Sequence, residues 1–226
     1  MKITHLYHSG FCVELEQSVL LFDWYEGVFP SFDPAKTLYV FVSHRHPDHY
    51  SKKIWELRHT YPNIHYILYK GICKLPPCEI TAVKANEAYT VGDASIRTLL
   101  STDEGVAYLV TIEGYTLYHA GDLNLWYWEG EAEQDNKWQI GTYKASIRKL
   151  KTLLNETAVD IAFLTLDPRQ EENAILGMEY FLHQIDVRCV LPMHYWDRQK
   201  EAMAYLTTRA LAPFRDKIHF DDEVQY

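Results

Sequence analysis

The chain has 226 residues, of which 47% are hydrophobic and 23% are charged, and its formal net charge is −9. This composition excludes a disordered chain, and the length fits a single domain over residues 1–226 with a sizeable core. So acidic a chain is a poor candidate for binding the nucleic-acid backbone over a broad face. No apolar run approaches the roughly 20 residues of a membrane helix, and residues 1–10 lack the apolar region of a signal peptide.

We therefore expect a cytoplasmic protein without a membrane or nucleic-acid partner. The oligomeric state stays open, and a homodimer is compatible with the sequence. A cytosolic chain of this size does not need disulfides. The four cysteines are accordingly expected to be structural thiols: Cys12, Cys73, Cys78 and Cys189.

The first half of the chain is predicted to form mainly β-strands, because short apolar runs alternate with turn residues such as Ser9-Gly10. Thr37–Ser43 is almost wholly apolar and suits a strand buried on both faces. Ser51 is a suitable N-cap for a helix that ends at Tyr61, before Pro62. The predicted strands are Lys2–Tyr7, Phe11–Glu16, Val19–Asp23, Thr37–Ser43, Ile64–Tyr69, Glu79–Val83, Ser95–Leu100, Val106–Ile112 and Thr116–His119.

Helices and strands alternate in the second half. Strands are predicted at Asp160–Leu166 and Arg188–Met193, and apolar residues at helical spacing predict helices between and around them. These helices are Tyr143–Asn155, Ile175–Ile185 and Lys200–Leu211. The order favours an α/β architecture of packed layers, with sheet inside and helices outside.

The segment Leu123–Ile140 is predicted to be a loop that is unusually rich in aromatic residues. It holds Trp126, Tyr127, Trp128 and Trp138 among acidic and polar residues. These rings suit the wall or lid of a pocket. The alternative is a loop that folds onto the surface with its rings partly buried.

The strongest chemical signal is Ser43-His44-Arg45-His46-Pro47-Asp48-His49, directly after the buried strand Thr37–Ser43. Ligand sites of open α/β sheets commonly form at the carboxyl ends of strands. Neutral imidazoles and a carboxylate are good ligands for zinc and related metals. Without partners, such a cluster would be costly to bury. The segment therefore predicts a metal site.

His44-x-His46-x-Asp48-His49 resembles the HxHxDH signature of the metallo-β-lactamase fold superfamily. His119-Ala120-Gly121-Asp122 resembles its Gly-Asp motif, and Pro192-Met193-His194 resembles the end of its last ligand strand. The opening Tyr7-His8-Ser9-Gly10-Phe11 is similar to the Gly-His-x-x-Phe start of the branch with lactonase-like and phosphodiesterase-like hydrolases. This resemblance implies a four-layer αββα sandwich, which some schemes class as α+β.

The resemblance also implies roles for these residues and a pair of divalent metal ions. His44 and His46 would bind the first metal, Asp48 and His49 the second, Asp122 would bridge the two, and His194 would complete the second site. Zinc is favoured, and manganese or iron is compatible. Asp48 and Asp122 are the residues assigned to catalysis, with Asp48 orienting a water molecule or accepting its proton.

One ligand of the superfamily pattern is missing. The stretch Ser101-Thr102-Asp103-Glu104-Gly105, where a further histidine for the first metal is expected, contains none. Asp103 is the most plausible substitute, since a carboxylate oxygen can bind zinc, and oxygen in place of nitrogen would tilt the preference toward manganese or iron. The competing interpretation is that Asp103 and Glu104 are ordinary turn residues.

Other residues are candidates for supporting the metals or contacting substrate. Asp23 resembles the early aspartate of the superfamily, and Arg169 is either an anion contact or part of a structural salt bridge. His119 either supports a metal ligand or packs in the core. The full set of such candidates is His8, Asp23, His119, Arg169 and Trp126, and Trp196 and Arg198 are further candidates for lining the pocket.

These features predict a metallo-hydrolase that uses a metal-activated water on a small ester, lactone or phosphodiester. A nuclease of the same fold is one alternative, which the net charge of −9 disfavours. A non-hydrolytic metal-binding or redox-active protein is the other, because a ligand histidine is missing.

Overall fold

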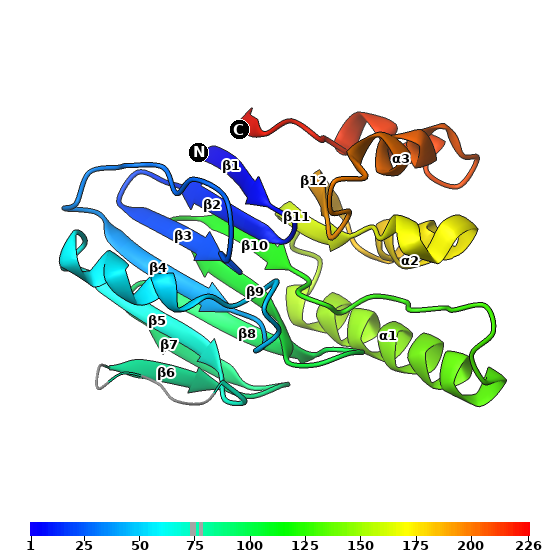
Figure 1. The fold of residues 1–226 in the computed structure, drawn as a ribbon, viewed down its shortest axis with the longest axis horizontal. Helices are drawn as coiled ribbons and strands as arrows, with labels where there is room; N and C mark the ends of the chain where they lie inside the picture. Colours follow the sequence, from blue (N-terminus) through cyan, green and yellow to red (C-terminus); the bar gives the residue numbers. More distant parts are fainter. Residues whose placement is uncertain (73–75, 77–78) are drawn as a thin grey trace.

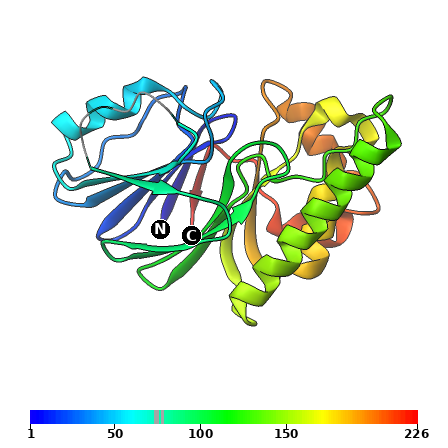
Figure 2. The ribbon, with the colours of Figure 1, turned by 90° about the horizontal axis from the view of Figure 1, so that it is seen from below.

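The computed structural model describes residues 1–72, 76 and 79–226. Two β-sheets pack face to face, and helices cover the outer face of each, as Figures 1 and 2 show. This arrangement confirms the αββα sandwich expected from the sequence. Cys12 and Cys189 are free thiols and are buried, whereas Cys73 and Cys78 lie outside the described residues.

The first sheet combines antiparallel and parallel pairing. Its described strands run in the order β13, β1, β2, β3, β4, β5 and β6, with parallel pairing from β3 through β6. Their bounds are Glu223–Gln225, Lys2–Tyr7, Gly10–Glu14, Ser18–Phe22, Thr37–Val42, Ile64–Tyr69 and Ile80–Val83, in the same order.

The second sheet is also mixed. Its described strands run in the order β12, β11, β10, β9, β8 and β7, and β10, β11 and β12 are parallel. Their bounds are Val187–Met193, Val159–Thr165, Tyr115–His119, Val106–Ile112, Ala94–Leu100 and Ala88–Val91, in the same order. The chain ends meet at the first sheet, where the amino group of Met1 donates to the carbonyl of Tyr226 at 3.1 Å.

Apolar side chains fill the space between the layers. Phe22 and Phe41 stack with ring centroids 4.8 Å apart, and Phe11 meets Phe163 of the other sheet at 4.3 Å. On the outer face of the first sheet, a smaller cluster packs under the 3₁₀ helix Lys52–His59. Outside the second sheet lie α1 (Glu133–Leu154), α2 (Leu176–Gln184) and α3 (Gln199–Ala204).

The parallel strands decide where chemistry can occur. Because parallel strands end at the same edge, the residues that follow them gather there. Asp23 follows β3, Ser43 and His44 follow β4, and His194 follows β12. Asp122 lies three residues beyond the end of β10. The two sheets thus bring segments that are distant in sequence to a common edge.

Several sequence predictions of local structure were wrong. Residues 133–140 belong to α1, which begins ten residues before the predicted start at Tyr143. Its first turns are polar and mostly exposed, so they lack the apolar stripe that identified the rest, although Glu133 and Asp135 suit the positive helix N-terminus. Strands β7 and β13 were not predicted, because they are short and partly exposed.

Two other predicted helices differ from the observed ones. The helix predicted over 51–61 is a 3₁₀ helix, with Ser51 at the N-cap as expected. The helix predicted over 200–211 ends at Ala204, and 3₁₀ helices follow it at Tyr205–Thr207 and Ala212–Lys217. Pro213 accounts for the second interruption, since proline is favoured at the first positions of a new helix.

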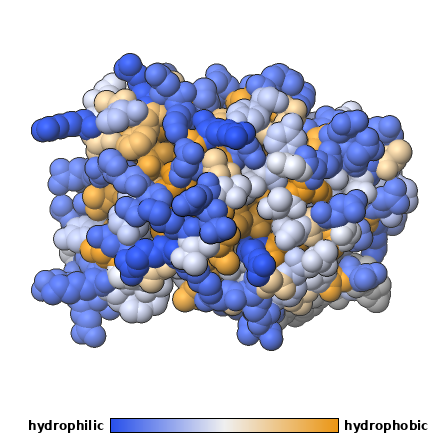
Figure 3. Space-filling view, turned by 180° about the vertical axis from the view of Figure 1, so that it is seen from behind, coloured by the Kyte–Doolittle hydropathy of each residue, from blue (hydrophilic) through white to orange (hydrophobic). Residues whose placement is uncertain are grey.

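Hydrophilic side chains cover most of the face opposite to that of Figure 1, with apolar ones in small areas between them (Figure 3). Among the described residues, no helix is long and apolar enough to cross a membrane.

Candidate metal centre

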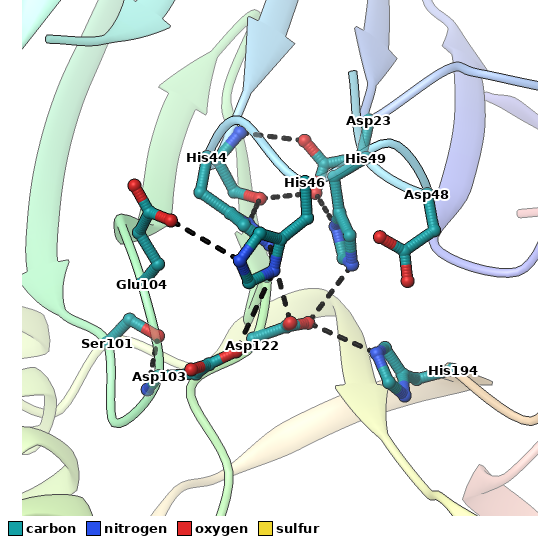
Figure 4. Close-up of polar contacts among 12 residues, drawn as sticks. Asp23, His44, His46, Asp48, His49, Ser101, Asp103, Glu104, Asp122 and His194 are labelled. Carbon is teal, nitrogen blue, oxygen red and sulfur yellow. Dashed lines mark hydrogen bonds and ion pairs between the residues drawn. The ribbon is translucent and has the colours of Figure 1, made fainter. Parts of the chain in front are cut away.

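The loop after β4 brings its histidines to the junction of the two sheets, around Asp122 (Figure 4). His44 and His49 are fully buried, whereas the side chain of His46 is 41% exposed. Nε2 of His44 lies 3.0 Å from Nδ1 of His46. The structure therefore brings together the residues that the HxHxDH motif singled out, with Asp48 beside them.

Asp23 fixes the proton positions on two of these histidines. Its Oδ2 lies 2.8 Å from Nδ1 of His49 and 2.6 Å from Oγ of Ser43, and Oγ of Ser43 lies 2.9 Å from Nδ1 of His44. An ionised carboxylate only accepts hydrogen bonds, so the Ser43 hydroxyl donates to Asp23. Nδ1 of His44 must then donate to Ser43, and Nδ1 of His49 to Asp23. Both histidines thus carry a proton on Nδ1, and Nε2 is the nitrogen left to bind a metal ion.

Asp167 has the same effect on His194. Its Oδ2 lies 3.1 Å from Nδ1 of His194 and accepts from Nη2 of Arg169 at 2.5 Å. Burial by itself would raise the pKa of Asp167, but hydrogen bonds from His194 and Arg169 outweigh it and lower the pKa to about 2. The ionised carboxylate therefore keeps the proton of His194 on Nδ1 and leaves Nε2 free. This carboxylate–histidine pairing is common around metal ligands.

Asp122 is the point on which the free nitrogens converge. Its Oδ2 lies 3.4 Å from Nε2 of His44, and its Oδ1 lies 3.2 Å from Nε2 of His49 and 3.4 Å from Nε2 of His194. Burial alone would raise the pKa of Asp122, but His49 and His194 outweigh it, and its pKa lies well below the usual range. One oxygen of the carboxylate thus faces His44, and the other faces His49 and His194.

The ionisable groups are poised for a cation. Burial lowers the pKa of His44 to about 4, so its ring is neutral at pH 7. Burial would also lower the pKa of His49, but the carboxylates of Asp122 and Asp23 raise it well above its ordinary value. In the absence of a metal, His49 therefore carries a second proton on Nε2, and a metal ion would take the place of that proton.

Two groups of side chains have the spacing of metal ligands. In each group, every residue offers one ligand atom, and these atoms all lie within 4.8 Å of one another. Two ligand atoms on one tetrahedral zinc ion are about 3.3 Å apart, because each Zn–N or Zn–O bond is about 2.0–2.1 Å. The separations of 3.0–3.4 Å around His44 and Asp122 match this spacing. The groups are His44, His46 and Asp122, and His8, Asp48, His49 and His194.

The hydrogen bonding of the buried ligand atoms supports the same conclusion. Nε2 of His49 and Oδ1 of Asp122 are buried and lie 3.2 Å apart, but neither makes a hydrogen bond of good geometry with the described residues. Unpartnered buried polar atoms are costly and rare in native proteins. A divalent cation would satisfy these atoms, so the residues present fit the metal ions that the fold implies.

Asp103 lies at the rim of the first group and outside it. Its Oδ2 is 3.8 Å from Nδ1 of His46, and its side chain is 51% exposed. Burial and the nearby Asp122 raise the pKa of Asp103. Glu104 is also close, with Oε2 3.3 Å from Nε2 of His46, but Arg45 pairs with its carboxylate at 2.9 Å. The structure thus places two carboxylates beside His46, where the sequence lacks a histidine.

Two glycines allow the close packing of these loops. Gly105 (φ +82°) and Gly121 (φ +53°) lie in the left-handed region, which glycine adopts most readily. A Cβ at Gly105 would lie 2.1 Å from the carbonyl oxygen of Ser43, and one at Gly121 would lie 2.8 Å from Cβ of Ser43. The start of the HxHxDH loop therefore packs directly against both glycines.

The other predicted site residues take different positions. His119 does not face the metal ligands: its Nε2 is 2.9 Å from the carbonyl of Ser9, and its Nδ1 accepts from the amide of Gly121 at 3.1 Å. It therefore fixes the turn before Asp122. Nε1 of Trp126 donates to the carbonyl of Asp122 at 3.0 Å, so this ring supports the ligand from the other side.

Residues after the last strand also differ from expectation. Trp196 packs on His8, with ring centroids 4.0 Å apart, whereas Arg198 pairs with Glu201 and does not line the pocket. Ser43 and Asp167 were not among the predicted site residues. Their signal was available, because each follows a buried strand of the sheet edge where the ligands gather.

A pocket of about 320 Å³ opens over the centre. Trp126 and Trp128 line it, so the first interpretation of the aromatic segment is correct for these two rings. Trp138 instead lies on α1 with 56% of its surface exposed. Arg169 pairs with Asp167, as one prediction had it, and it also lines the pocket, where the other prediction placed an anion contact. The pocket-lining residues are His46, Asp48, Asp103, Asp122, Trp126, Trp128, Gln139, Arg169 and His194.

A family model described as a beta-lactamase superfamily domain matches residues 2–137, more than half of the chain. The chain belongs to the beta-lactamase superfamily. This assignment confirms the resemblance drawn from the sequence motifs. Related sequences include a UPF0173 metal-dependent hydrolase of Cereibacter sphaeroides, which is 25% identical over 223 residues and covers 86% of both chains. A UPF0173 metal-dependent hydrolase of Opitutus terrae is 26% identical over 218 residues, which cover 86% of this chain and 85% of the relative.

Solved structures with the same fold include Igni18, a metallo hydrolase from Ignicoccus hospitalis. It has a TM-score of 0.64 and 14% sequence identity, and the alignment covers 100% of this chain and 98% of that protein. CmlA, a diiron beta-hydroxylase from Streptomyces venezuelae, has a TM-score of 0.63 and 11% identity, and the match covers 99% of this chain and 53% of that one. At these identities, the likeness establishes the fold.

Proposed function

We propose that this member of the beta-lactamase superfamily is a metal-dependent hydrolase that acts on a small ester, lactone or phosphodiester. The observation that carries the proposal is the convergence of three Nε2 atoms, those of His44, His49 and His194, on the Asp122 carboxylate within 3.4 Å. The relatives of similar length described as metal-dependent hydrolases agree with it.

The proposal assigns the ligands as the sequence resemblance did. His44 and His46 hold the first ion, Asp48, His49 and His194 the second, and Asp122 faces both. Asp103 is the proposed substitute for the missing histidine of the first site. Bound divalent ions supply Lewis acidity and lower the pKa of a bound water toward about 7. Zinc fits the imidazole-rich donor set, and the carboxylates beside His46 leave manganese or iron open.

Asp48 is proposed to orient the attacking water. It lines the pocket, and although burial would raise its pKa, the imidazoles of His8 and His49 lower it well below the usual range. A carboxylate with so low a pKa stays ionised and is a weak proton acceptor, so orientation fits it better than proton abstraction. Asp122 keeps the nitrogens of His44, His49 and His194 directed toward a common point.

The pocket indicates the kind of substrate. Its volume of about 320 Å³ suits a small molecule. Trp126 and Trp128 offer an apolar wall for a ring or an alkyl group. Within the described part of the chain, Arg169 is the one Lys or Arg side chain that lines the pocket, and its guanidinium suits an anionic group such as a phosphodiester. The proposal treats residues 1–226 as one domain, because both sheets supply residues to this site.

A non-hydrolytic metal protein is the alternative that the structure keeps open. It is favoured by the oxygen-rich surroundings of His46, where Asp103 and Glu104 lie within 3.8 Å and 3.3 Å of ring nitrogens. If the first site binds metal weakly, the second metal site would remain, and the protein would have a binding role or a redox role there.

The decisive experiment combines metal content with a substrate panel. Protein purified without chelator or affinity metal is analysed for metal per chain, then assayed on phosphodiesters, lactones, simple esters and RNA. We expect close to two metals per chain and turnover of a phosphodiester or lactone. Asp122→Asn should lose both, while Asp160→Asn, which changes a buried aspartate that accepts from the Thr116 amide away from the site, should keep both.

Different outcomes separate the alternatives. Metal binding without turnover of any substrate class favours the non-hydrolytic protein, and turnover of RNA alone favours the nuclease. The pocket wall is tested with Trp128→Ala, which should raise KM about tenfold on a ring-bearing substrate, equivalent to about 1.4 kcal/mol, and leave metal content unchanged. An unchanged KM would contradict the role of the aromatic wall.

A further inference from the structure

His8 is a buried imidazole whose ring nitrogens make no hydrogen bond with the described residues. Its relative exposure is 0%. A neutral imidazole carries one N–H donor and one acceptor. Leaving both unsatisfied in the interior costs about 1–3 kcal/mol for each group. The ring must therefore gain a partner that the protein alone does not provide.

The position of the ring indicates that partner. Nε2 of His8 lies 3.5 Å from Oδ2 of Asp48, at the limit of a hydrogen bond and close to the spacing of two ligands on one ion. Its ring centroid is 4.2 Å from that of His194 and 5.7 Å from that of His49. His8 is thus surrounded by the residues assigned above to the second metal.

The backbone holds His8 in a strained conformation at this place. His8 has φ +55°, and His194, whose amide donates to the carbonyl of His8 at 3.2 Å, has φ +69°. Non-glycine residues in this region cost about 1–3 kcal/mol, and such strain is concentrated at functional sites. His5 stabilises the arrangement, because its Nε2 lies 3.2 Å from the same carbonyl. The strain directs the His8 ring into the site.

We propose that His8 is a direct ligand of the second metal, so that this site is closed by His8, Asp48, His49 and His194. The assignment rests on the proposed function for the presence of the metal and adds a ligand that lies outside the HxHxDH, Gly-Asp and final-histidine motifs. Each of these four residues offers one ligand atom, and the four atoms all lie within 4.8 Å of one another. A ring nitrogen of His8 would be the fourth side-chain donor of this group.

This assignment makes the two sites unequal. The second site has four side-chain donors of its own, three of them imidazoles. The first has His44, His46 and the shared Asp122, and Asp103 stands at its rim. The second site should therefore fill first and bind more tightly, and the first should exchange its metal readily.

The test is a titration of metal-free protein with Zn²⁺ in competition with a chromophoric chelator, which needs no substrate. Wild type should show a tight and a weak step. His8→Asn keeps a residue type that tolerates positive φ but cannot reach the ion. It should weaken the tight step by more than about 100-fold, which exceeds the effect expected for a residue that only positions a ligand. His183→Asn, which removes an exposed imidazole packed on Phe214, is the matched control.

Nitrogen NMR on histidine-labelled wild type provides a second readout that does not depend on a variant. One ring nitrogen of His8 should shift with the first equivalent of Zn²⁺, together with those of His49 and His194. A folded His8→Asn protein that binds both equivalents with wild-type affinity, or a His8 ring whose signals ignore the first equivalent, overturns the assignment. A wild type that takes up no metal contradicts the proposed function itself.

Discussion

Nδ1 of His49 lies 2.8 Å from Oδ2 of Asp23, and both side chains are buried. The same carboxylate oxygen accepts from the Ser43 hydroxyl, and Oδ1 accepts from the Ser43 amide at 2.7 Å. One aspartate at the end of β3 therefore sets the tautomers of two proposed ligands at the end of β4.

Asp23→Asn should weaken metal binding while leaving every proposed ligand in place. The Asp23 carboxylate accepts three hydrogen bonds, from the Ser43 hydroxyl and His49 on Oδ2 and from the Ser43 amide on Oδ1. Asparagine places an NH2 donor at one of these oxygens, so it cannot accept all three. A wrong tautomer would put a proton on Nε2 of His44 or His49. We expect a 10–100-fold loss of affinity, measured by chelator competition.

The matched control for this change is again Asp160→Asn. Asp160 is a buried carboxylate that accepts from the Thr116 amide at 2.8 Å and pairs with Arg188, away from the metal ligands. The Asp160→Asn protein should bind metal with the affinity of wild type. Equal affinity in Asp23→Asn would show that Asp23 does not control the ligand tautomers.

Replacing Asp103 should lower metal content more than replacing Glu104. Asp103 faces Nδ1 of His46 and lines the pocket, whereas the Glu104 carboxylate already pairs with Arg45 at 2.9 Å. Metal per chain is expected to fall from near two toward one in Asp103→Ala, and to stay near two in Glu104→Gln. Elemental analysis of both purified variants measures this, and the reverse order would assign the ligand role to Glu104.

Gly105→Ala should destabilise the protein more than Gly114→Ala, although both glycines have a φ near +80°. The left-handed conformation costs an alanine about 1–2 kcal/mol at either position. A Cβ at Gly105 would also lie 2.1 Å from the Ser43 carbonyl oxygen, while nothing lies within 4 Å of one at Gly114. We expect Gly105→Ala to lose at least about 2 kcal/mol more in urea unfolding. Equal losses would mean that the HxHxDH loop adjusts freely.

The metal-free protein should be most stable around neutral pH. Burial lowers the pKa of His8 and His44 to about 4, below the ordinary value near 6.5, so the unfolded state binds more protons and stability falls as the pH drops below about 6.5. The pKa of His49 lies well above its ordinary value, so its contribution is complete below about 6.5 and is lost as the pH rises through the folded value.

Metal should abolish the alkaline loss of stability, because the ion replaces the proton on Nε2 of His49, which faces Asp122, while Nδ1 keeps its proton toward Asp23. Urea unfolding at about pH 5, 7 and 9, with chelator and with Zn²⁺, tests both effects. A metal-free protein whose stability keeps rising toward pH 9 would show that His49 is neutral in the empty centre.

The sequence determined the chemistry of the centre, because HxHxDH is local. His44, His46, Asp48 and His49 lie within six positions after a strand whose apolar residues identify it as buried, and periodicity identified the strands β1, β4, β5, β9 and β11 closely. The Gly-Asp and final-histidine motifs follow apolar strands too, so they could be placed at the same edge before any contact was known.

Only the tertiary structure decided how these residues act. The position of Ser43 and Asp167 after buried strands was visible in the sequence, but their partners, and the carbonyl contacts of His119 and Trp126, depend on which strand ends meet. His8 lies beside Asp48 because the turns after β1 and β4 meet at one edge of the first sheet, and it lies beside His194 because the amide after β12 of the other sheet donates to its carbonyl. The polar start of α1 was missed because it lacks the apolar stripe of the rest of the helix. Periodicity reports the burial of single elements, whereas proton positions and ligand spacing depend on contacts between elements that are far apart in the chain.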